Sequence, residues 1–170
     1  MPTLTDEDLT IRAVRAEDAE AVARIYNHYI ANTVVTFEEA AVPASEIAQR
    51  FEVVRSAALP WLVAQVGGQV SGYAYASRWN GRSAYKFSAE ITVYLAPERA
   101  GRGVGSRLYD ELFELLRARG THVVIAGISL PNDASVALHE KFGLEKVAYF
   151  KEVGHKFGRW IDVGYWQRTL

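Results

Sequence analysis

The spacing of apolar side chains along the chain predicts four helices. Over residues 17–32 and 104–119 they recur every three to four positions, which places them on one helix face. In the second segment this face carries Val104, Leu108, Leu112, Leu115 and Leu116. Two shorter helices are expected over 45–57 and 132–142, bounded by Pro60 and Gly143 respectively.

Segments rich in β-branched and aromatic residues, bounded mostly by Gly or Pro, predict strands. They cover residues 9–14, 61–66, 70–79, 89–95, 122–130, 144–153 and 160–168. The order is strand, helix, helix, three strands, helix, strand, helix and two strands. That order predicts α/β or α+β architecture, with helices on the faces of a mixed sheet, in a single domain over residues 1–170.

Three local signals are expected to set the ends of these elements. Gly67 and Gly68 can supply the positive φ angles of a tight hairpin between two strands. Ser45 is a candidate N-cap, because its hydroxyl can accept from the free N–H groups of a first helical turn. Gly120 is expected to end helix 104–119.

Composition removes several classes of function. Hydrophobic residues make up 49% and charged residues 23%, as in an ordinary folded domain. Lys plus Arg number 19 against 20 for Asp plus Glu, so a net charge of −1 favours neither nucleic acid nor a membrane surface as partner. Without cysteine there is no thiol nucleophile, disulfide or cysteine-ligated metal, and without an HExxH pattern we expect no metal.

The first nine residues, MPTLTDEDL, are acidic and lack the basic start and apolar run of a signal peptide. No apolar stretch approaches the ~20 residues that span a bilayer. The sequence therefore predicts a cytoplasmic protein.

A glycine-rich loop, AGRGVGS at 100–106, follows one predicted strand and opens the helix after it. Glycines let backbone N–H groups approach an anion, and a helix N-terminus favours phosphate. Arg99 and Arg102 add positive charge. A loop that merely turns the chain is the alternative, and an isolated G-x-G does not decide between them. Neither a P-loop nor a dinucleotide motif fits, because no Gly-Lys-Ser/Thr follows and Leu108 replaces the third glycine.

Together with the strand AEITVYL at 89–95, this loop resembles the acyl-CoA pyrophosphate motif of the GNAT superfamily. Gly103 and Gly105 match that motif, whereas Ala100 stands where the family usually has Arg or Gln. Three longer segments resemble the phosphinothricin acetyltransferases and their methionine sulfone and sulfoximine relatives: IYNHYIANTVVTFEE (25–39), LPNDASVALHEKFGL (130–144) and VGHKFGRWIDVGYWQ (153–167). The resemblance covers nearly the whole chain.

This resemblance implies a GNAT fold, with a mixed and mostly antiparallel sheet, and an acetyl-CoA-dependent N-acetyltransferase. The implied substrate is a small amino-acid-like molecule whose amine attacks the thioester directly. The implied acetyl-CoA contacts are Val93, Tyr94, Leu95, Gly101, Arg102, Gly103, Val104, Gly105, Ser106, Asn132 and Ser135. Asn132 also begins a predicted helix, and N-capping is compatible with a contact to the pantetheine arm.

Glu90 stands in an otherwise apolar predicted strand, where a carboxylate is unfavourable without a partner or a purpose. Acetylation requires an amine that has lost its proton, so a base held by the sheet would assist. An ion pair with an arginine explains the residue equally well from the sequence alone. By resemblance, Glu90 occupies the general-base position of the family, and partial desolvation would raise its pKa.

Two further residues are catalytic candidates. His139 takes a family position near the reacting centre, although a lone histidine is more often packed or at the surface. Tyr94 is a candidate acid for the departing thiolate, and backbone N–H groups around it are a candidate oxyanion site.

Arg82 is the expected clamp for an anionic substrate group, because a guanidinium can form a two-pronged hydrogen bond. Solvated loop charges are the alternative for Arg82 and Arg78. The resemblance implies substrate contacts at Asn80, Gly81, Arg82, Tyr85 and Glu90, with Phe37 and Thr92 as further wall residues.

Trp160, Tyr165 and Trp166 alternate along the last strand, and we interpret them as core or interface residues of a homodimer rather than a platform for bases. Two other functions stay open. One is acetylation of a protein N-terminus or lysine, which would need an open groove in place of the Arg82 clamp. The other is a non-catalytic acyl-CoA sensor, which the fold alone does not exclude.

Overall fold

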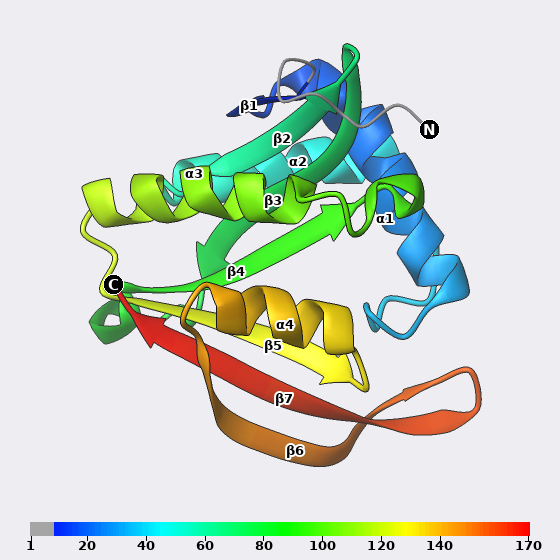
Figure 1. Cartoon of the computed structure of the whole chain (residues 1–170), viewed down its shortest axis with the longest axis vertical. Coiled ribbons are helices and arrows are strands. Elements are labelled where there is room, and N and C mark those ends of the chain that lie inside the picture. Colours follow the sequence, from blue (N-terminus) through cyan, green and yellow to red (C-terminus); the bar gives the residue numbers. More distant parts are fainter. Residues whose placement is uncertain (1–8) are drawn as a thin grey trace.

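The computed structural model describes residues 9–170 and builds them around one seven-stranded sheet with helices on both faces (Figure 1). The strands are β1 (Leu9–Ala13), β2 (Trp61–Val66), β3 (Gln69–Arg78), β4 (Ser88–Leu95), β5 (Val123–Leu130), β6 (Glu145–Lys156) and β7 (Arg159–Thr169). The α-helices are α1 (Ala19–Asn32), α2 (Ala44–Ser56), α3 (Val104–Ala118) and α4 (Asp133–Lys141), and short 3₁₀ turns occupy Ala16–Asp18, Ser83–Tyr85 and Pro97–Arg99. The predicted α/β architecture and element order are confirmed.

The strands lie in the order β1-β2-β3-β4-β5-β7-β6, and every neighbouring pair is antiparallel except β4 and β5. These two parallel strands pair over only three positions, from Ser88 with Val123 to Glu90 with Ile125. Beyond Glu90 they diverge, as Figure 1 shows for the green and yellow arrows. The sheet therefore opens at its centre, immediately after Glu90.

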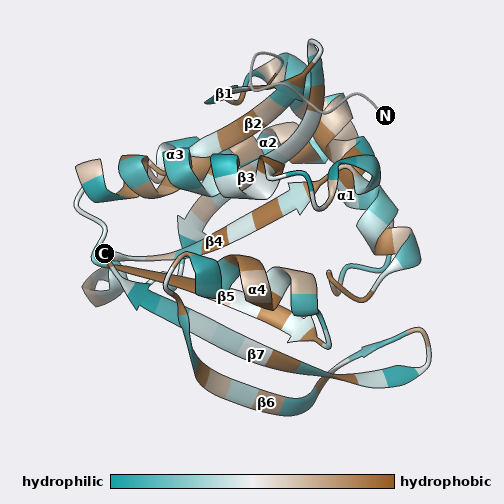
Figure 2. Ribbon diagram, in the orientation of Figure 1, coloured by the Kyte–Doolittle hydropathy of each residue, from teal (hydrophilic) through white to brown (hydrophobic). Residues whose placement is uncertain are grey.

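Helices α3 and α4 lie on one face of the sheet, and α2 lies on the opposite face with α1 beside it (Figure 1). The predicted apolar stripe of α3 packs on the sheet, with Val104, Leu108, Leu112 and Leu116 fully buried. Leu115, which we expected on the same face, is 44% exposed. Figure 2 shows the resulting two-sided colouring of α3, with its hydrophilic side turned away from the strands.

The expected hairpin glycines are confirmed, since Gly67 and Gly68 have φ angles of 58° and 79° between β2 and β3. Gly120 also ends α3 as expected, with φ of 80° and its N–H bonded to the carbonyl of Arg117 at 3.0 Å. The predicted cap at Ser45 is wrong. Helix α2 begins one residue earlier, after the extended Pro43, so Ser45 already lies inside the first turn.

Within residues 9–170, no helix is both long enough and apolar enough to cross a membrane. The prediction that residues 1–9 are not a signal peptide is not tested, because all but the last of them lie outside the described residues.

Candidate active site

The glycine loop places the N-terminus of α3 at the end of β4. Gly103 is the N-cap and adopts φ of 80°, a left-handed conformation that glycine reaches without strain. Its carbonyl accepts the first helical hydrogen bond from the N–H of Arg107, at 3.1 Å. The N–H groups of Val104, Gly105 and Ser106 precede that bond and are available for an external acceptor. A phosphate fits this arrangement of donors and helix dipole.

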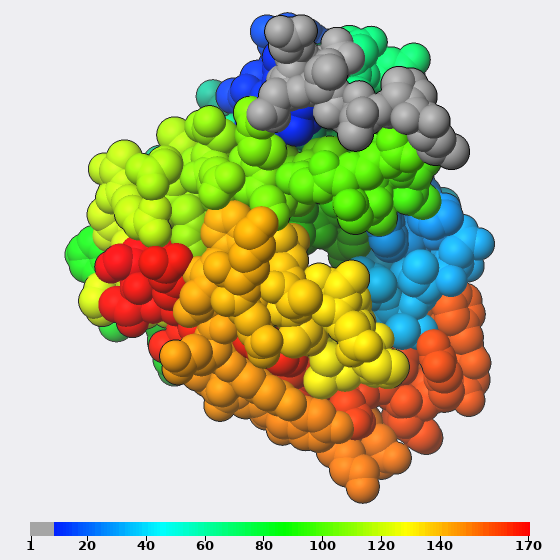
Figure 3. Space-filling model, viewed as in Figure 1, coloured from blue at the N-terminus to red at the C-terminus, as the bar shows by residue number. Residues whose placement is uncertain are grey.

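A groove of about 380 Å³ runs along this helix end, and we call it the glycine-loop groove. Its walls come from α3 and its preceding loop, from the start of α4, and from β4. Figure 3 shows the hollow between the green N-terminal part of α3, the yellow start of α4 and the blue end of α1. The lining includes the predicted cofactor residues Val93, Tyr94, Leu95, Gly101, Gly103, Gly105, Ser106, Asn132 and Ser135.

Two predicted cofactor residues do not line this groove. The side chain of Val104 is fully buried in the core, and Arg102 is exposed to solvent. Only their backbone groups remain as candidate contacts. Asn132 caps α4 as expected, because its side-chain oxygen accepts from the N–H of Ser135 at 3.2 Å.

A second cavity, of about 230 Å³, lies where β4 and β5 diverge, and we call it the Glu90 cavity. It is lined by Glu90 and Thr92 from β4, by Gly127 and Ser129 from β5, and by His139 from α4. Five residues line both this cavity and the glycine-loop groove: Val35, Val93, Tyr94, Asn132 and Ser135. The opening in the sheet therefore joins a candidate phosphate site to a partly buried carboxylate.

Within residues 9–170, Glu90 makes no hydrogen bond or ion pair, so the arginine partner considered as the alternative is absent. Burial raises the pKa of this carboxyl above its usual value of 4.5. An unpaired carboxylate with a raised pKa is a better proton acceptor than one at the surface. Glu90 has the properties expected of a general base.

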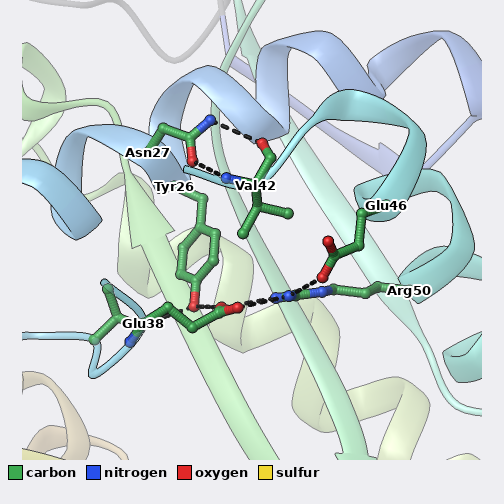
Figure 4. Close-up of polar contacts among 7 residues, drawn as sticks. Tyr26, Asn27, Glu38, Val42, Glu46 and Arg50 are labelled. Carbon is green, nitrogen blue, oxygen red and sulfur yellow. Dashed lines mark hydrogen bonds and ion pairs between the residues drawn. The ribbon is translucent and has the colours of Figure 1, made fainter. Parts of the chain in front are cut away.

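The loop 33–43 between α1 and α2 contributes Val35 to the walls of both cavities and Thr36 to the Glu90 cavity alone. Glu38 anchors this loop, because both of its carboxylate oxygens accept from Arg50 of α2, at 2.7 and 2.9 Å. Its carboxylate also accepts from the hydroxyl of Tyr26, and Asn27 binds the backbone of Val42 (Figure 4). The hydrogen bonds from Arg50 lower the pKa of Glu38, which stays charged at neutral pH.

The same loop is also held by β6, because the buried Lys156 donates to the carbonyl of Thr36 at 2.8 Å. Phe37, a predicted wall residue, is 41% exposed and its ring packs over Gly154, where even a Cβ atom would lie 2.3 Å from the ring. Phe37 is absent from the lining of both cavities. Its neighbours Val35 and Thr36 take the place on the wall that we expected for it.

Tyr94 lies at the junction of the two cavities and packs against three other tyrosine rings. The centroid distances are 5.3 Å to Tyr26, 5.1 Å to Tyr29 and 5.6 Å to Tyr73. Burial raises the pKa of the Tyr94 phenol far above its usual value. At neutral pH this hydroxyl is therefore a hydrogen-bond donor that releases its proton reluctantly.

The predicted substrate contacts Asn80, Gly81, Arg82 and Tyr85 line a different cavity, of about 340 Å³, which we call the Arg82 cavity. It shares no lining residue with the Glu90 cavity. Arg78, Lys86 and Arg119 also line it, and no acidic side chain of residues 9–170 does, so it suits an anion. Within a single copy of the chain, Arg82 and Glu90 therefore line separate cavities.

Three features of these cavities were not predicted from the sequence. On the wall of the Glu90 cavity, the hydroxyl of Ser129 is buried and has no hydrogen-bond partner in the described part of the chain. Lys141 of α4 donates to the hydroxyl of Ser106 at 2.9 Å, which brings a cation to the N-terminus of α3. Tyr109 of α3, fully buried, contacts His139 at 2.8 Å. Ser129 could have been singled out as the hydroxyl in the otherwise apolar β5, and the other two depend on tertiary packing.

A larger cavity of about 490 Å³ lies between α2 and the end of β1. Its walls are mainly apolar, with Phe51, Trp61 and Leu62 among them, and it shares no residue with the groove or the Glu90 cavity. In the described part of the chain, no three His, Asp or Glu side chains are grouped so as to hold a metal ion.

Several known proteins are similar to this chain. The chain matches the acetyltransferase (GNAT) domain family over residues 11–164. The phosphinothricin N-acetyltransferase of Streptomyces viridochromogenes is 42% identical over 160 residues, covering 94% of this chain and 87% of that protein. The L-methionine sulfoximine/L-methionine sulfone acetyltransferase of Salmonella typhimurium is 33% identical over 162 residues, covering 95% of each.

Among solved structures, a GNAT superfamily phosphinothricin acetyltransferase from Sinorhizobium meliloti in complex with acetyl-CoA superposes with a TM-score of 0.92. It is 38% identical, and the match covers 96% of this chain and 89% of that one. The glycine loop, the divergent strands and the extent of these matches lead to one conclusion. The chain belongs to the GNAT family of acetyltransferases.

Proposed function

We propose that this protein is a cytosolic N-acetyltransferase that moves the acetyl group of acetyl-CoA to the amine of a small amino-acid-like substrate. Phosphinothricin and methionine sulfone or sulfoximine, named for the relatives above, represent the substrate class. The observation that carries the proposal is the unpaired Glu90 in a cavity joined to the glycine-loop groove through the opening between β4 and β5.

The groove residues fit acetyl-CoA. The left-handed Gly103 and the free N–H groups after it suit the pyrophosphate, and Lys141 supplies a cation that compensates for Ala100 in the usual Arg or Gln position. The unpartnered hydroxyl of Ser129 is available for a polar group beyond the opening in the sheet. Bound acetyl-CoA supplies an acetyl group activated as a thioester.

Glu90 accepts the proton of the substrate ammonium, directly or through a water molecule, and the neutral amine then attacks the acetyl carbon. No acyl-enzyme is needed. Backbone N–H groups of β4 near Tyr94 stabilise the negative charge that develops on the carbonyl oxygen. The Tyr94 hydroxyl donates a hydrogen bond to the departing thiolate, for which its position at the junction of both cavities is suitable. The proton that completes the CoA thiol is the second one that the amine nitrogen releases as the amide forms.

The closed form of the site favours a small acceptor over a protein chain. The anchored loop 33–43 covers one side of the Glu90 cavity, whose volume of about 230 Å³ suits a single amino acid. A non-catalytic acyl-CoA sensor would not need a partly buried carboxylate without a partner, because removing such a group from water lowers the stability of the fold.

The acceptor class is tested by measuring thiol release from acetyl-CoA with a panel of amino acids, their sulfone and phosphinate analogues, and matched amines that lack the acidic group. We expect turnover with the acids. Arg82→Ala should lower kcat/KM for the acids by about ten- to a hundredfold, as loss of a charged hydrogen bond does, with little effect on simple amines.

Arg82→Lys should restore only part of this loss, since lysine keeps the charge without the fork geometry. An equal loss for acids and simple amines would make Arg82 structural. No turnover with any acceptor, in a protein that binds acetyl-CoA, would favour the sensor.

We also propose that the chain works as a homodimer in which Arg82 of one copy serves the Glu90 cavity of the other. Exposed apolar side chains support a second copy as partner, and they lie beside Arg82 and on the terminal hairpin: Tyr85, Phe87, Val147, Tyr149, Phe150, Val153, Phe157 and Trp160. Trp166, by contrast, is buried in the core. Pairing through a common surface would be reciprocal, so each copy would complete the other.

Mixing subunits tests the homodimer. Sedimentation velocity should give the mass of two chains. Co-expressed Arg82→Ala and Glu90→Gln chains should regain about a quarter of wild-type activity, because half of randomly paired dimers carry one intact site of two. A monomer in solution, or no recovery in mixed dimers, would refute this assignment.

A further inference from the structure

His139 and Tyr109 form a buried hydrogen-bonded pair between α4 and α3. The Tyr109 hydroxyl lies 2.8 Å from Nε2 of His139, and the two rings meet edge to face with centroids 5.3 Å apart. Tyr109 is fully buried and His139 is 4% exposed. The other ring nitrogen, Nδ1, lies 2.7 Å from the backbone carbonyl of Ser135 and 3.4 Å from its hydroxyl.

These contacts fix the protonation of the ring. A carbonyl oxygen only accepts, so Nδ1 of His139 must carry a hydrogen to bond Ser135 at 2.7 Å. In a neutral ring Nε2 is then an acceptor, and the Tyr109 hydroxyl is its donor. Burial lowers the pKa of the imidazole, which agrees with a neutral ring. His139 is therefore the Nδ1–H tautomer with both nitrogens engaged.

A ring in this state has no free proton for a leaving sulfur and no free lone pair for a substrate ammonium. If Nε2 of His139 took up a proton, it could no longer accept the hydrogen bond from the Tyr109 hydroxyl. The Tyr109 hydroxyl has no other hydrogen-bond partner among residues 9–170, so its proton would be left unsatisfied in the core. The geometry therefore disfavours His139 as acid or base.

The pair instead lies where it can set the distance between two helices. Residues of α3 and its loop form one wall of the glycine-loop groove, including Gly105 and Ser106, and residues of α4 form the other, including Ser135 and Leu138. The walls meet closely, since a Cβ atom added at Gly105 would lie 3.3 Å from Leu138. A small displacement of α4 would therefore alter the width of the groove.

We propose that His139 is a positioning residue that, through Tyr109, holds α4 at the distance from α3 at which the groove admits the acyl-CoA arm. Only the kinetic test of this assignment rests on the proposed function. The hydrogen bond, the tautomer and the stability of the pair are measurable without any substrate.

Three variants separate positioning from proton transfer. Tyr109→Phe removes the donor and keeps the ring shape. His139→Ala removes the acceptor, whereas His139→Gln offers an amide oxygen near the place of Nε2 but does not titrate. Tyr109→Phe and His139→Ala should each raise the acetyl-CoA KM about three- to tenfold, the factor that one hydrogen bond provides, and lower Tm. The double variant should be little worse than either single one.

His139→Gln should recover most of what His139→Ala loses, and Tyr109→Phe should leave the pH profile of kcat in place. ¹⁵N NMR of the wild-type imidazole should show the Nδ1–H tautomer near neutral pH, and Tyr109→Phe should shift this signal. A hundredfold loss of kcat in His139→Gln with unchanged KM would establish proton transfer and overturn the proposal. The Nε2–H tautomer in wild type would overturn it as well, whether or not the enzyme turns over.

Discussion

Replacing Glu90 by glutamine is expected to lower kcat by about 10²-fold or more at neutral pH, the usual loss when a general base is removed. The substitution keeps the shape of the side chain and removes its ability to accept a proton. Acetyl-CoA affinity should be retained, because Glu90 does not line the glycine-loop groove. Turnover and cofactor binding measured on the same sample check both statements.

The pH dependence of the reaction offers a second measurement on Glu90. Burial raises the pKa of its carboxyl, so the basic form appears at higher pH than for an exposed glutamate. Activity should therefore fall as pH drops through this raised pKa, and the corresponding limb of the kcat/KM profile should vanish in Glu90→Gln. Glu114→Gln, the same change on the exposed surface of α3, is the control and should keep the wild-type profile.

Stability provides a readout that does not depend on catalysis. Because the folded-state pKa of Glu90 is raised, the folded chain binds more protons than the unfolded chain between the two pKa values. The contribution of Glu90 to stability is therefore most favourable at low pH and is lost as pH rises through the folded pKa. Glu90→Gln should raise Tm at pH 7, whereas Glu114→Gln should not. Wild-type turnover in Glu90→Gln would remove Glu90 from the mechanism.

The fold could be predicted from the sequence because periodicity, turn chemistry and breakers agree over most of the chain. The glycines between β2 and β3 are local features, and so are the apolar stripe of α3 and the stop at Gly120. Leu115 and Ser45 show the limits of such patterns. A leucine at the edge of the stripe lies toward solvent, and a two-residue shift of the N-cap, from Ser45 to Pro43, turns an expected cap into a first-turn residue.

The candidate site could be predicted only in part, for a related physical reason. Glu90 lies in β4, and the glycine loop is the connection from β4 to α3. Because they are neighbours along the chain, a site that uses both could be predicted from the sequence. The anchoring of loop 33–43 by Arg50 and Lys156 joins segments up to 120 residues apart, which no local pattern records. The separation of Arg82 from Glu90 has the same origin, since it depends on where loop 79–87 folds relative to β5.

Substitutions at the two motif glycines should weaken acetyl-CoA binding for different reasons. Gly105 has ordinary backbone angles and lies beneath Leu138 and Leu95, 3.3 and 3.6 Å from an added Cβ atom. The branched side chain of Gly105→Val would push α4 outward or fill the groove between the helices. Gly103 has φ of 80° in open surroundings, so Gly103→Ala strains the backbone that presents the N–H groups without creating a clash.

We expect Gly105→Val to raise the acetyl-CoA KM by about ten- to a hundredfold, because a blocked groove would keep the phosphates from at least one charged hydrogen bond at the N-terminus of α3. Gly103→Ala should have a smaller effect of the same kind. Gly120→Ala is a matched control, because Gly120 also has φ of 80° with no atom within 4 Å of an added Cβ, but lies at the opposite end of α3. The Tm of Gly120→Ala should fall as that of Gly103→Ala does, whereas its acetyl-CoA KM should stay at the wild-type value. An equal rise of KM in both alanine variants would attribute the effect to strain in α3, and unchanged binding in a folded Gly105→Val would refute the phosphate cradle.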